Sequence, residues 1–185
     1  MQNTILAQRY AKALFELTLE LKKLEEVRKD MAMLLETIAE SKEFRHFLMS
    51  PVIQADKKTK VLKALFSGRM EEVTLKFMEL LAKNRRESDL KIISEEFIEQ
   101  YKEYKNITTV NLITAVKISD TLKKDILEKM SKYTGGTIDL IEEVDKKLIG
   151  GFITRIEGQQ YDASLLRVFN QLRKEFGKNL YIRGI

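Results

Sequence analysis

The sequence predicts an α+β protein, with an N-terminal six-helix bundle followed by a small C-terminal α/β domain. Two observations support this prediction. Up to about residue 105 the apolar residues recur at helical spacing among strong helix formers. From residue 106 the pattern changes to strands alternating with helices. We therefore expect two domains, at residues 1–105 and 106–185, joined by a short connection.

Stop and start signals divide the first domain into its helices. Pro51 ends one helix because its ring and its missing N–H disfavour continuation. Asp56 can cap the next helix, and Gly68 can adopt the positive φ that closes it. The helices are expected at residues 4–20, 22–41, 43–48, 56–67, 70–84 and 87–104.

The second domain begins with a run of β-branched residues. Residues 109–116 predict a strand, and Ser119 then caps a helix that ends near Gly135. The next expected elements are strands at 138–144 and 148–157 and a final helix with its cap at Asp162. The apolar residues of that helix keep a spacing of four, three and four; they are Leu165, Phe169, Leu172 and Phe176. One face of the sheet should pack on helices while the other stays partly open.

Composition excludes several classes of protein. The chain has no cysteine, which excludes disulfides, thiolate metal sites and cysteine nucleophiles. It has no run of 18 apolar residues, so we expect no membrane-spanning helix, and its start does not resemble a signal peptide. The net charge of +5 divides into +2 for residues 1–105 (20 Lys/Arg against 18 Asp/Glu) and +3 for residues 106–185 (13 against 10). Neither domain has the clustered positive charge that nucleic-acid binding requires.

The sequence offers little catalytic chemistry. His46 is the only histidine and has no ligand or base partner at a suitable spacing, so we expect a surface or packing role for it. Gly150-Gly151 precedes a predicted strand and not a helix, which argues against a phosphate-binding loop. We expect these glycines to permit a close backbone approach or a bulge. No catalytic residue, metal site or cofactor is expected.

Two other classes of protein, an RNA-recognition module and an enzyme, are alternatives to a protein-binding adaptor. An RNA-recognition module needs aromatic stacking platforms on its strands, and the predicted strands offer only Phe152. An enzyme needs a pocket of convergent polar groups, and the carboxylates here are interleaved with lysines as on solvated surfaces. The RNA-binding module is the stronger of these two alternatives.

Two helices carry more apolar surface than one packing face needs. The helix at 5–22 has an apolar arc of roughly 200°, and the helix at 70–84 one of roughly 220°, whereas packing on a core needs about 100°. The first arc divides into two seams: Leu6, Tyr10, Ala13 and Leu17 form one, and Ala7, Ala11, Leu14 and Leu21 form the other. Either both helices are enclosed within their own bundle, or they form a groove for a separate amphipathic helix. Helical-wheel projections do not distinguish between these possibilities, and they do not show which seam faces a partner.

The chain also resembles a known family in several segments. These are Arg9–Phe15, Ser50–Ile53, Leu80–Arg86, Asp145–Phe152, Arg155–Gly158 and Asp162–Leu165. In this order and over nearly the whole chain, they resemble the delta subunits of F-type ATP synthases. The mitochondrial counterpart of these subunits is the oligomycin-sensitivity-conferring protein.

The resemblance implies a non-catalytic stator subunit. Such a subunit links the catalytic head to the peripheral stalk and resists rotational torque during proton-driven ATP synthesis, as a peripheral protein at the cytoplasmic face of the cell membrane. Its N-terminal domain would hold the N-terminal helix of an alpha subunit, and its C-terminal domain would contact the C-terminus of the stalk b subunit. The implied groove residues are Leu6, Tyr10, Ala13, Leu17, Phe77 and Leu80.

Overall fold

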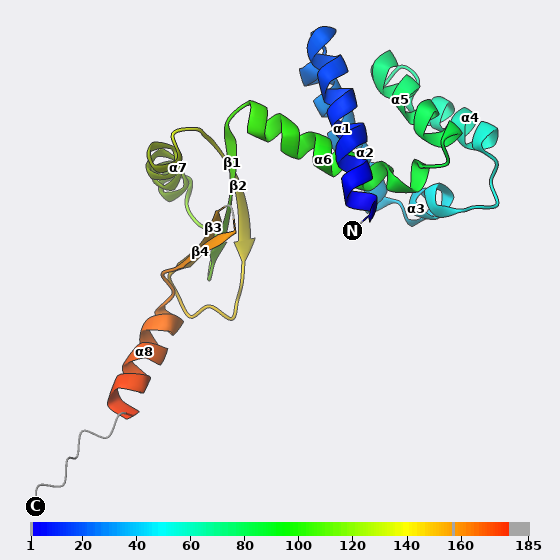
Figure 1. The fold of residues 1–185 in the computed structure, drawn as a ribbon. Coiled ribbons are helices and arrows are strands. Elements are labelled where there is room, and N and C mark those ends of the chain that lie inside the picture. Colours follow the sequence, from blue (N-terminus) through cyan, green and yellow to red (C-terminus); the bar gives the residue numbers. More distant parts are fainter. Residues whose placement is uncertain (1, 157, 178–185) are drawn as a thin grey trace, which may run out of the picture. The chain divides into compact units, whose positions relative to one another are not determined.

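The computed structural model describes residues 2–156 and 158–177 of the chain. Contacts divide the chain into two compact units, Met1–Tyr104 and Lys105–Ile185 (Figure 1). The described residues of the first unit form helices, and those of the second form helices and a four-stranded sheet. The mixture of helices with a sheet is the predicted α+β class.

The helices of the first unit lie close to their predicted ranges. They are α1 (Gln2–Glu20), α2 (Leu24–Glu40), α3 (Lys42–Met49), α4 (Ala55–Phe66), α5 (Glu72–Lys83) and α6 (Leu90–Tyr104). Residues 87–89 differ from the prediction, because they form a separate 3₁₀ turn, η1 (Glu87–Asp89), before α6. The predicted cap at Asp56 is also wrong. The N-cap position of α4 is Gln54, and Asp56 lies inside the first turn, where its charge still favours the helix N-terminus.

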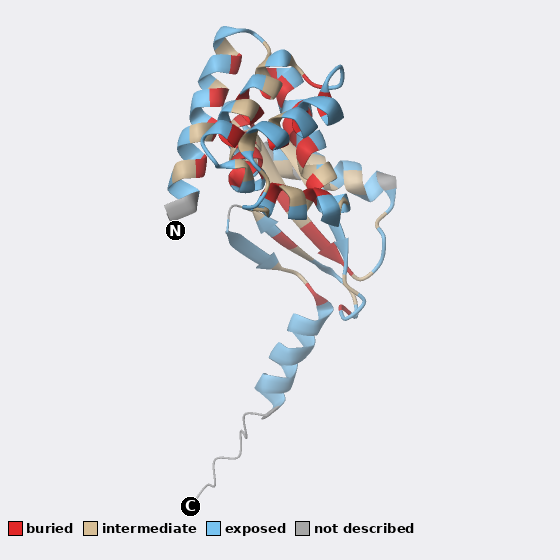
Figure 2. Cartoon of the chain, turned by 90° about the vertical axis from the view of Figure 1, so that its right-hand side faces the viewer, coloured by how far each residue is buried: buried red, intermediate tan, exposed pale blue. Residues whose placement is uncertain are grey.

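α6 is the central helix of the first unit. α1 and α2 pack along it, while α4 packs mainly on α5. The residues buried along α2 and α6 are Val27, Met31, Leu34, Leu90, Ile93 and Phe97. Figure 2 shows buried segments on the helices of this unit. The helical periodicity of the sequence therefore corresponds to a core built around α6.

The second unit is built on a sheet with strand order β2-β1-β3-β4. Its elements are β1 (Ile107–Thr114), α7 (Asp120–Thr134), β2 (Thr137–Val144), β3 (Phe152–Ile156), β4 (Gln159–Asp162) and α8 (Leu165–Gly177). β1 pairs in parallel with β2, to which α7 connects it, and pairs antiparallel with β3. β4 was not predicted, because its residues include only one strong strand former, Tyr161.

The caps in the second unit are partly as predicted. The Ser119 side chain accepts a hydrogen bond from the Leu122 N–H and begins α7, and Gly135 ends the helix at φ 70°. The predicted cap at Asp162 is wrong, since Ser164 accepts the hydrogen bond from the Arg167 N–H that begins α8. Asp162 instead accepts from the Ser164 N–H at 2.8 Å, so it supports the residue that makes the cap.

The two faces of the sheet are covered to different extents. Val110, Leu112 and Thr154 share one face and are buried, and the ion pair between Lys123 of α7 and Glu142 of β2 lies on the same face. On the other face, Ile141 is 48% exposed opposite Asn111, and Arg155 is exposed. α7 therefore covers the more apolar face.

Candidate partner-binding surfaces

α1 has two apolar seams, and the unit buries one of them. The buried seam contains Ala7, Ala11 and Leu14. The other seam contains Leu6 and Tyr10, which are half-buried, and Ala13 and Leu17, which are exposed. Leu21 was grouped with this seam from the sequence, but it is 48% exposed because it follows the end of α1 at Glu20. The bundle thus uses one seam of α1 and leaves the other at its surface.

α5 directs the two predicted residues, Phe77 and Leu80, toward α1. The Phe77 ring meets the Tyr10 ring edge to face, with centroids 6.4 Å apart. Leu80 shares this side because residues three apart are neighbours on a helix surface. The opposite side of α5 faces α4, where Glu79 pairs with Lys63 at 2.7 Å. Phe77 is buried and Leu80 is 48% exposed, so part of the excess arc of α5 is used inside the unit.

Contacts at two places set α1 beside α5. Near one end, Asn84 Nδ2 donates to Tyr10 Oη at 3.4 Å. Near the other, Lys23 Nζ donates to Glu71 Oε2 at 2.5 Å. Because Tyr10 and Lys23 are 13 residues apart on one segment, and Glu71 and Asn84 are 13 apart on the other, the two helices run in opposite directions. We use the name α1–α5 surface for the six predicted groove residues, of which Tyr10 and Phe77 are in contact; they are Leu6, Tyr10, Ala13, Leu17, Phe77 and Leu80.

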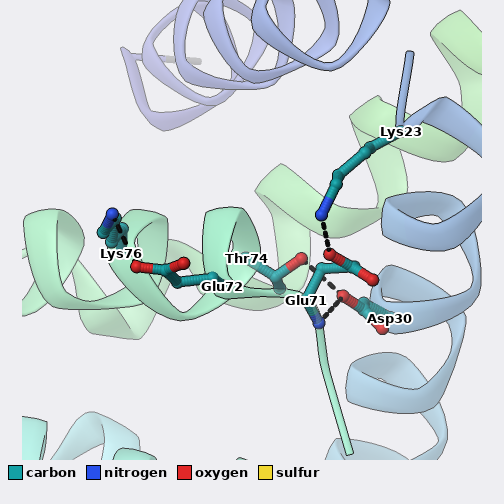
Figure 3. Close-up of polar contacts among 6 residues, drawn as sticks. All are labelled: Lys23, Asp30, Glu71, Glu72, Thr74 and Lys76. Atoms are coloured by element: carbon teal, nitrogen blue, oxygen red, sulfur yellow. Dashed lines mark hydrogen bonds and ion pairs between the residues drawn. The ribbon is translucent and has the colours of Figure 1, made fainter. Parts of the chain in front are cut away.

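A buried carboxylate holds the start of α5. The N-cap residue Glu71 makes no side-chain cap of its own. Asp30 of α2 supplies one, accepting hydrogen bonds from the Glu71 N–H at 2.9 Å and from Thr74 Oγ1 at 2.6 Å (Figure 3). A carboxylate at a helix N-terminus satisfies free N–H groups and interacts favourably with the helix dipole. This contact ties α5 to α2 beside the α1–α5 surface.

Burial raises the pKa of Asp30, and the hydrogen bonds from Thr74 and from the Glu71 backbone oppose that rise. Sequence reasoning did not single out Asp30, although a signal exists. Its position falls on the same helix face as the buried residues Val27 and Leu34, so it interrupts an apolar stripe. A polar residue on such a stripe usually finds a buried hydrogen-bond partner.

A second buried polar contact joins α3, α4 and η1. Lys58 is 1% exposed, and its Nζ donates to the Leu48 carbonyl at 2.9 Å and pairs with Glu87. Lys58 lies four residues before the buried Leu62 on α4, so its place on the apolar row was visible in the sequence. The pair serves to lock the helix ends together, because a buried charge without its partner is costly.

The other side of α1 forms a hollow with α6. Polar residues of α1, including Arg9, Lys12 and Glu16, line this hollow together with Glu96 and Glu99. Its lining mixes charges of both signs with apolar residues. It therefore differs from the α1–α5 surface, whose named residues are all apolar or aromatic.

α8 exposes its apolar residues, which we call the α8 stripe: Leu165, Val168, Phe169, Leu172 and Phe176 are 43–86% exposed. Figure 2 shows α8 as exposed along its whole length. The polar residues Arg167, Asn170 and Lys174 line a hollow together with Ile153 of β3. The apolar Leu166 borders the same hollow, and the apolar and polar side chains of α8 alike are exposed over residues 165–176.

The remaining singled-out residues take no part in these surfaces. His46 is exposed near the end of α3, as predicted. Gly151 allows a close backbone approach, also as predicted, whereas Gly150 lies against the Leu165 side chain. No group of three or more His, Cys, Asp or Glu in the described part of the chain could hold a metal ion. Among those same residues, no helix is long and apolar enough to cross a bilayer.

Exposed apolar surfaces on the helices of two units define the class of protein as an α+β adaptor. Comparison with known proteins refines this class. The family model described as "ATP synthase delta (OSCP) subunit" matches residues 6–176. The protein called ATP synthase subunit delta in Cytophaga hutchinsonii is 32% identical over 176 residues, covering 95% of this chain and 96% of that protein. Its counterpart in Christiangramia forsetii is 32% identical over 185 residues, covering all of both chains.

The fold agrees with a solved structure. A chain in the Toxoplasma gondii mitochondrial ATP synthase hexamer superposes with a TM-score of 0.74 at 23% identity, covering 92% of this chain and 97% of that one. The chain belongs to the ATP synthase delta (OSCP) subunit family. Its function is that of a stator subunit of the ATP synthase, and the alternative of an RNA-binding module is not supported.

Proposed function

We propose that the chain joins two helical partners and has no catalytic activity of its own. The α1–α5 surface binds the amphipathic N-terminal helix of an alpha subunit, and the α8 stripe binds the C-terminus of the b subunit. In this way the first predicted domain, residues 1–105, holds the catalytic head, and the second, residues 106–185, contacts the peripheral stalk. The protein then acts peripherally at the cytoplasmic face of the cell membrane.

The observation that carries the first contact is the exposed seam of α1 beside α5. Leu17 and Leu80 are 44% and 48% exposed, and Ala13 between Tyr10 and Leu17 has a small side chain that leaves room for an incoming helix. Burying about 400 Å² of apolar surface would contribute roughly 10 kcal/mol before ordering costs. A joint that resists torque needs an interaction of this order.

The test uses a synthetic peptide with the sequence of the alpha-subunit N-terminal helix from the same organism. Leu80→Asp places a charge on the α1–α5 surface and should weaken peptide binding at least about tenfold, measured by fluorescence anisotropy. Leu80 is the better target than Phe77, because Phe77 is buried and its replacement would also disturb the core.

Leu65→Asp is the matched control. Leu65 is 47% exposed on α4, which packs on the opposite side of α5, so this variant adds the same charge away from the surface. Equal affinities for the two variants would contradict the assignment of the alpha-subunit contact.

The second contact is tested with the soluble part of the b subunit from the same organism. Phe169→Asp in the α8 stripe should weaken binding at least about tenfold, while Tyr161→Asp on β4 should leave it unchanged. The two side chains are 62% and 65% exposed in the same unit, so they differ in location and not in accessibility. Full binding by Phe169→Asp would show that the stalk contact lies elsewhere.

A further inference from the structure

The start of α8 is seated against the loop that precedes β3. The Leu165 N–H donates to the Gly150 carbonyl at 2.9 Å, and the Ala163 N–H donates to the Phe152 carbonyl at 2.9 Å. Ser164, which caps the helix, is itself buried. The first residues of α8 are thus fixed by backbone contacts on both sides of Gly151.

Two glycines make this seat possible. A Cβ at Gly151 would lie 2.3 Å from the Ala163 carbonyl oxygen and 2.9 Å from Ser164 Cα, and neither backbone atom can move alone. A Cβ at Gly150 would lie 2.8 Å from Leu165 Cδ1, the end of a side chain that can rotate away. Gly151 also has a φ of +79°, which favours glycine. Any side chain at 151 would therefore displace the start of α8.

The contacts at the start of α8 set the orientation of the whole helix. Every later residue of α8 takes its angular position from the first turn, at about 100° per residue. With the start held as observed, Arg167 and Lys174 border the hollow beside Ile153, and the α8 stripe is exposed to solvent. Without it, the apolar residues would gain by rotating toward the unit's own apolar surface, because burial of apolar area is favourable.

We propose that Gly150-Gly151 is a positioning element that presents the α8 stripe to the stalk partner, with Gly151 as the residue that sets the orientation of α8. This inference rests on the proposed contact between α8 and the b subunit. It gives the glycine pair a role in binding, although neither residue touches the partner.

The closing experiment compares Gly151→Ala with Gly158→Ala in the full chain. Gly158 has a φ of +80°, so an alanine there experiences the same backbone strain, but its Cβ would meet nothing within 4 Å. Binding of the soluble part of the b subunit should weaken at least about tenfold in Gly151→Ala and remain within about twofold of wild type in Gly158→Ala. Binding of the alpha-subunit peptide should be unchanged in both variants, because their substitutions lie in the second unit.

A distance measurement separates orientation from stability. The chain has no cysteine, so spin labels at Gln159→Cys on β4 and Arg173→Cys on α8 report on these two elements alone. Gly151→Ala should shift or broaden the label–label distance distribution in pulsed EPR, whereas Gly158→Ala should not.

Each outcome has a definite meaning. If Gly151→Ala binds the b subunit as tightly as Gly158→Ala does, the positioning role is wrong, even if Phe169→Asp abolishes binding. If Phe169→Asp binds normally, the proposed stalk contact itself fails. If Gly151→Ala does not fold, Ser164→Ala decides, because it removes the hydroxyl that begins α8 without altering the α8 stripe: weaker binding than Gly158→Ala supports the seat, and equal binding overturns it.

Discussion

The α1–α5 surface and the α8 stripe are both exposed and apolar, but their own units hold them differently. α1 packs along α6 and meets α5 at Tyr10 and, through the following turn, at Lys23. α8 is held mainly at its start, where Leu165 and Ser164 contact the loop before β3 and the end of β4. One surface is thus fixed along its length, and the other at one end.

This difference predicts how each surface contributes to partner binding. A surface that is already ordered loses little conformational freedom when a partner binds, so more of its apolar burial appears as affinity. A helix held at one end can adjust its path to a partner, at the cost of ordering it on binding. We therefore expect mutations inside the first unit to act through stability, and mutations along α8 to act almost entirely through binding.

The largest effect is expected at the buried ion pair of the first unit. Lys58→Ala leaves Glu87 without its cation and should lower the free energy of unfolding of this unit by about 3–5 kcal/mol. Chemical denaturation measures this change. The control is Lys76→Ala, which removes the exposed pair with Glu72 on α5 and should leave stability nearly unchanged. A similar stability for both variants would show that the buried pair does not hold the unit.

The next largest effect on stability is expected at Asp30, the residue of α2 that caps the start of α5. Asp30→Ala leaves the Glu71 N–H and Thr74 hydroxyl without their acceptor and should cost about 1–3 kcal/mol of stability. It should also weaken binding of the alpha-subunit peptide, because α5 loses its hydrogen bonds to α2. Asp30→Asn retains an acceptor oxygen and should lose less on both measurements. Equal losses for the two substitutions would contradict a capping role.

The two units should respond to pH in opposite directions at two aspartates. Burial raises the pKa of Asp30, so its contribution to stability is fully present below the unfolded-state pKa and is lost as pH rises through the folded-state pKa. Hydrogen bonds from Ser164 lower the pKa of Asp162, so its contribution is present above the unfolded-state pKa and is lost as pH falls through the folded-state pKa.

Denaturation of the full chain between pH 7 and pH 3 measures both effects. As pH falls, wild type should gain stability relative to Asp30→Asn and lose stability relative to Asp162→Asn. Slopes of the same sign for both comparisons would contradict the different environments of the two carboxyl groups.

The smallest effect on stability is expected at the end of the α8 stripe. Phe176 is 86% exposed, so Phe176→Ser should change the free energy of unfolding by less than about 0.5 kcal/mol. The same variant should weaken binding of the b subunit, as measured by titration calorimetry. Phe97→Ala, in the core of the first unit, is the contrasting control and should cost about 3–5 kcal/mol. A large stability loss at Phe176 would mean that the stripe packs within its own unit.

Much of the fold could be predicted because its signals are local. Helical spacing located α1 to α6 within a few residues, and the cap at Ser119 and the stop at Gly135 were read from single residues. β4 and the cap at Ser164 were missed, because a short strand and a one-turn cap depend on neighbours that the local pattern does not include. A close backbone approach at Gly150-Gly151 was predicted, but the sequence did not show that the approaching backbone is that of Ala163 and Ser164.

The sequence by itself determined which residues are apolar and at what spacing, and so it determined that α1 and α5 carry broad apolar arcs and that α8 carries an apolar stripe. Only the tertiary structure decided that Ala7, Ala11 and Leu14 face inward while Leu17 faces out, and that Asp30 caps a helix 41 residues away. The physical reason is that periodicity is a property of one segment, whereas burial depends on which segments meet. The sequence of each helix shows which of its sides are apolar, but only packing against other helices determines which side remains available to a partner.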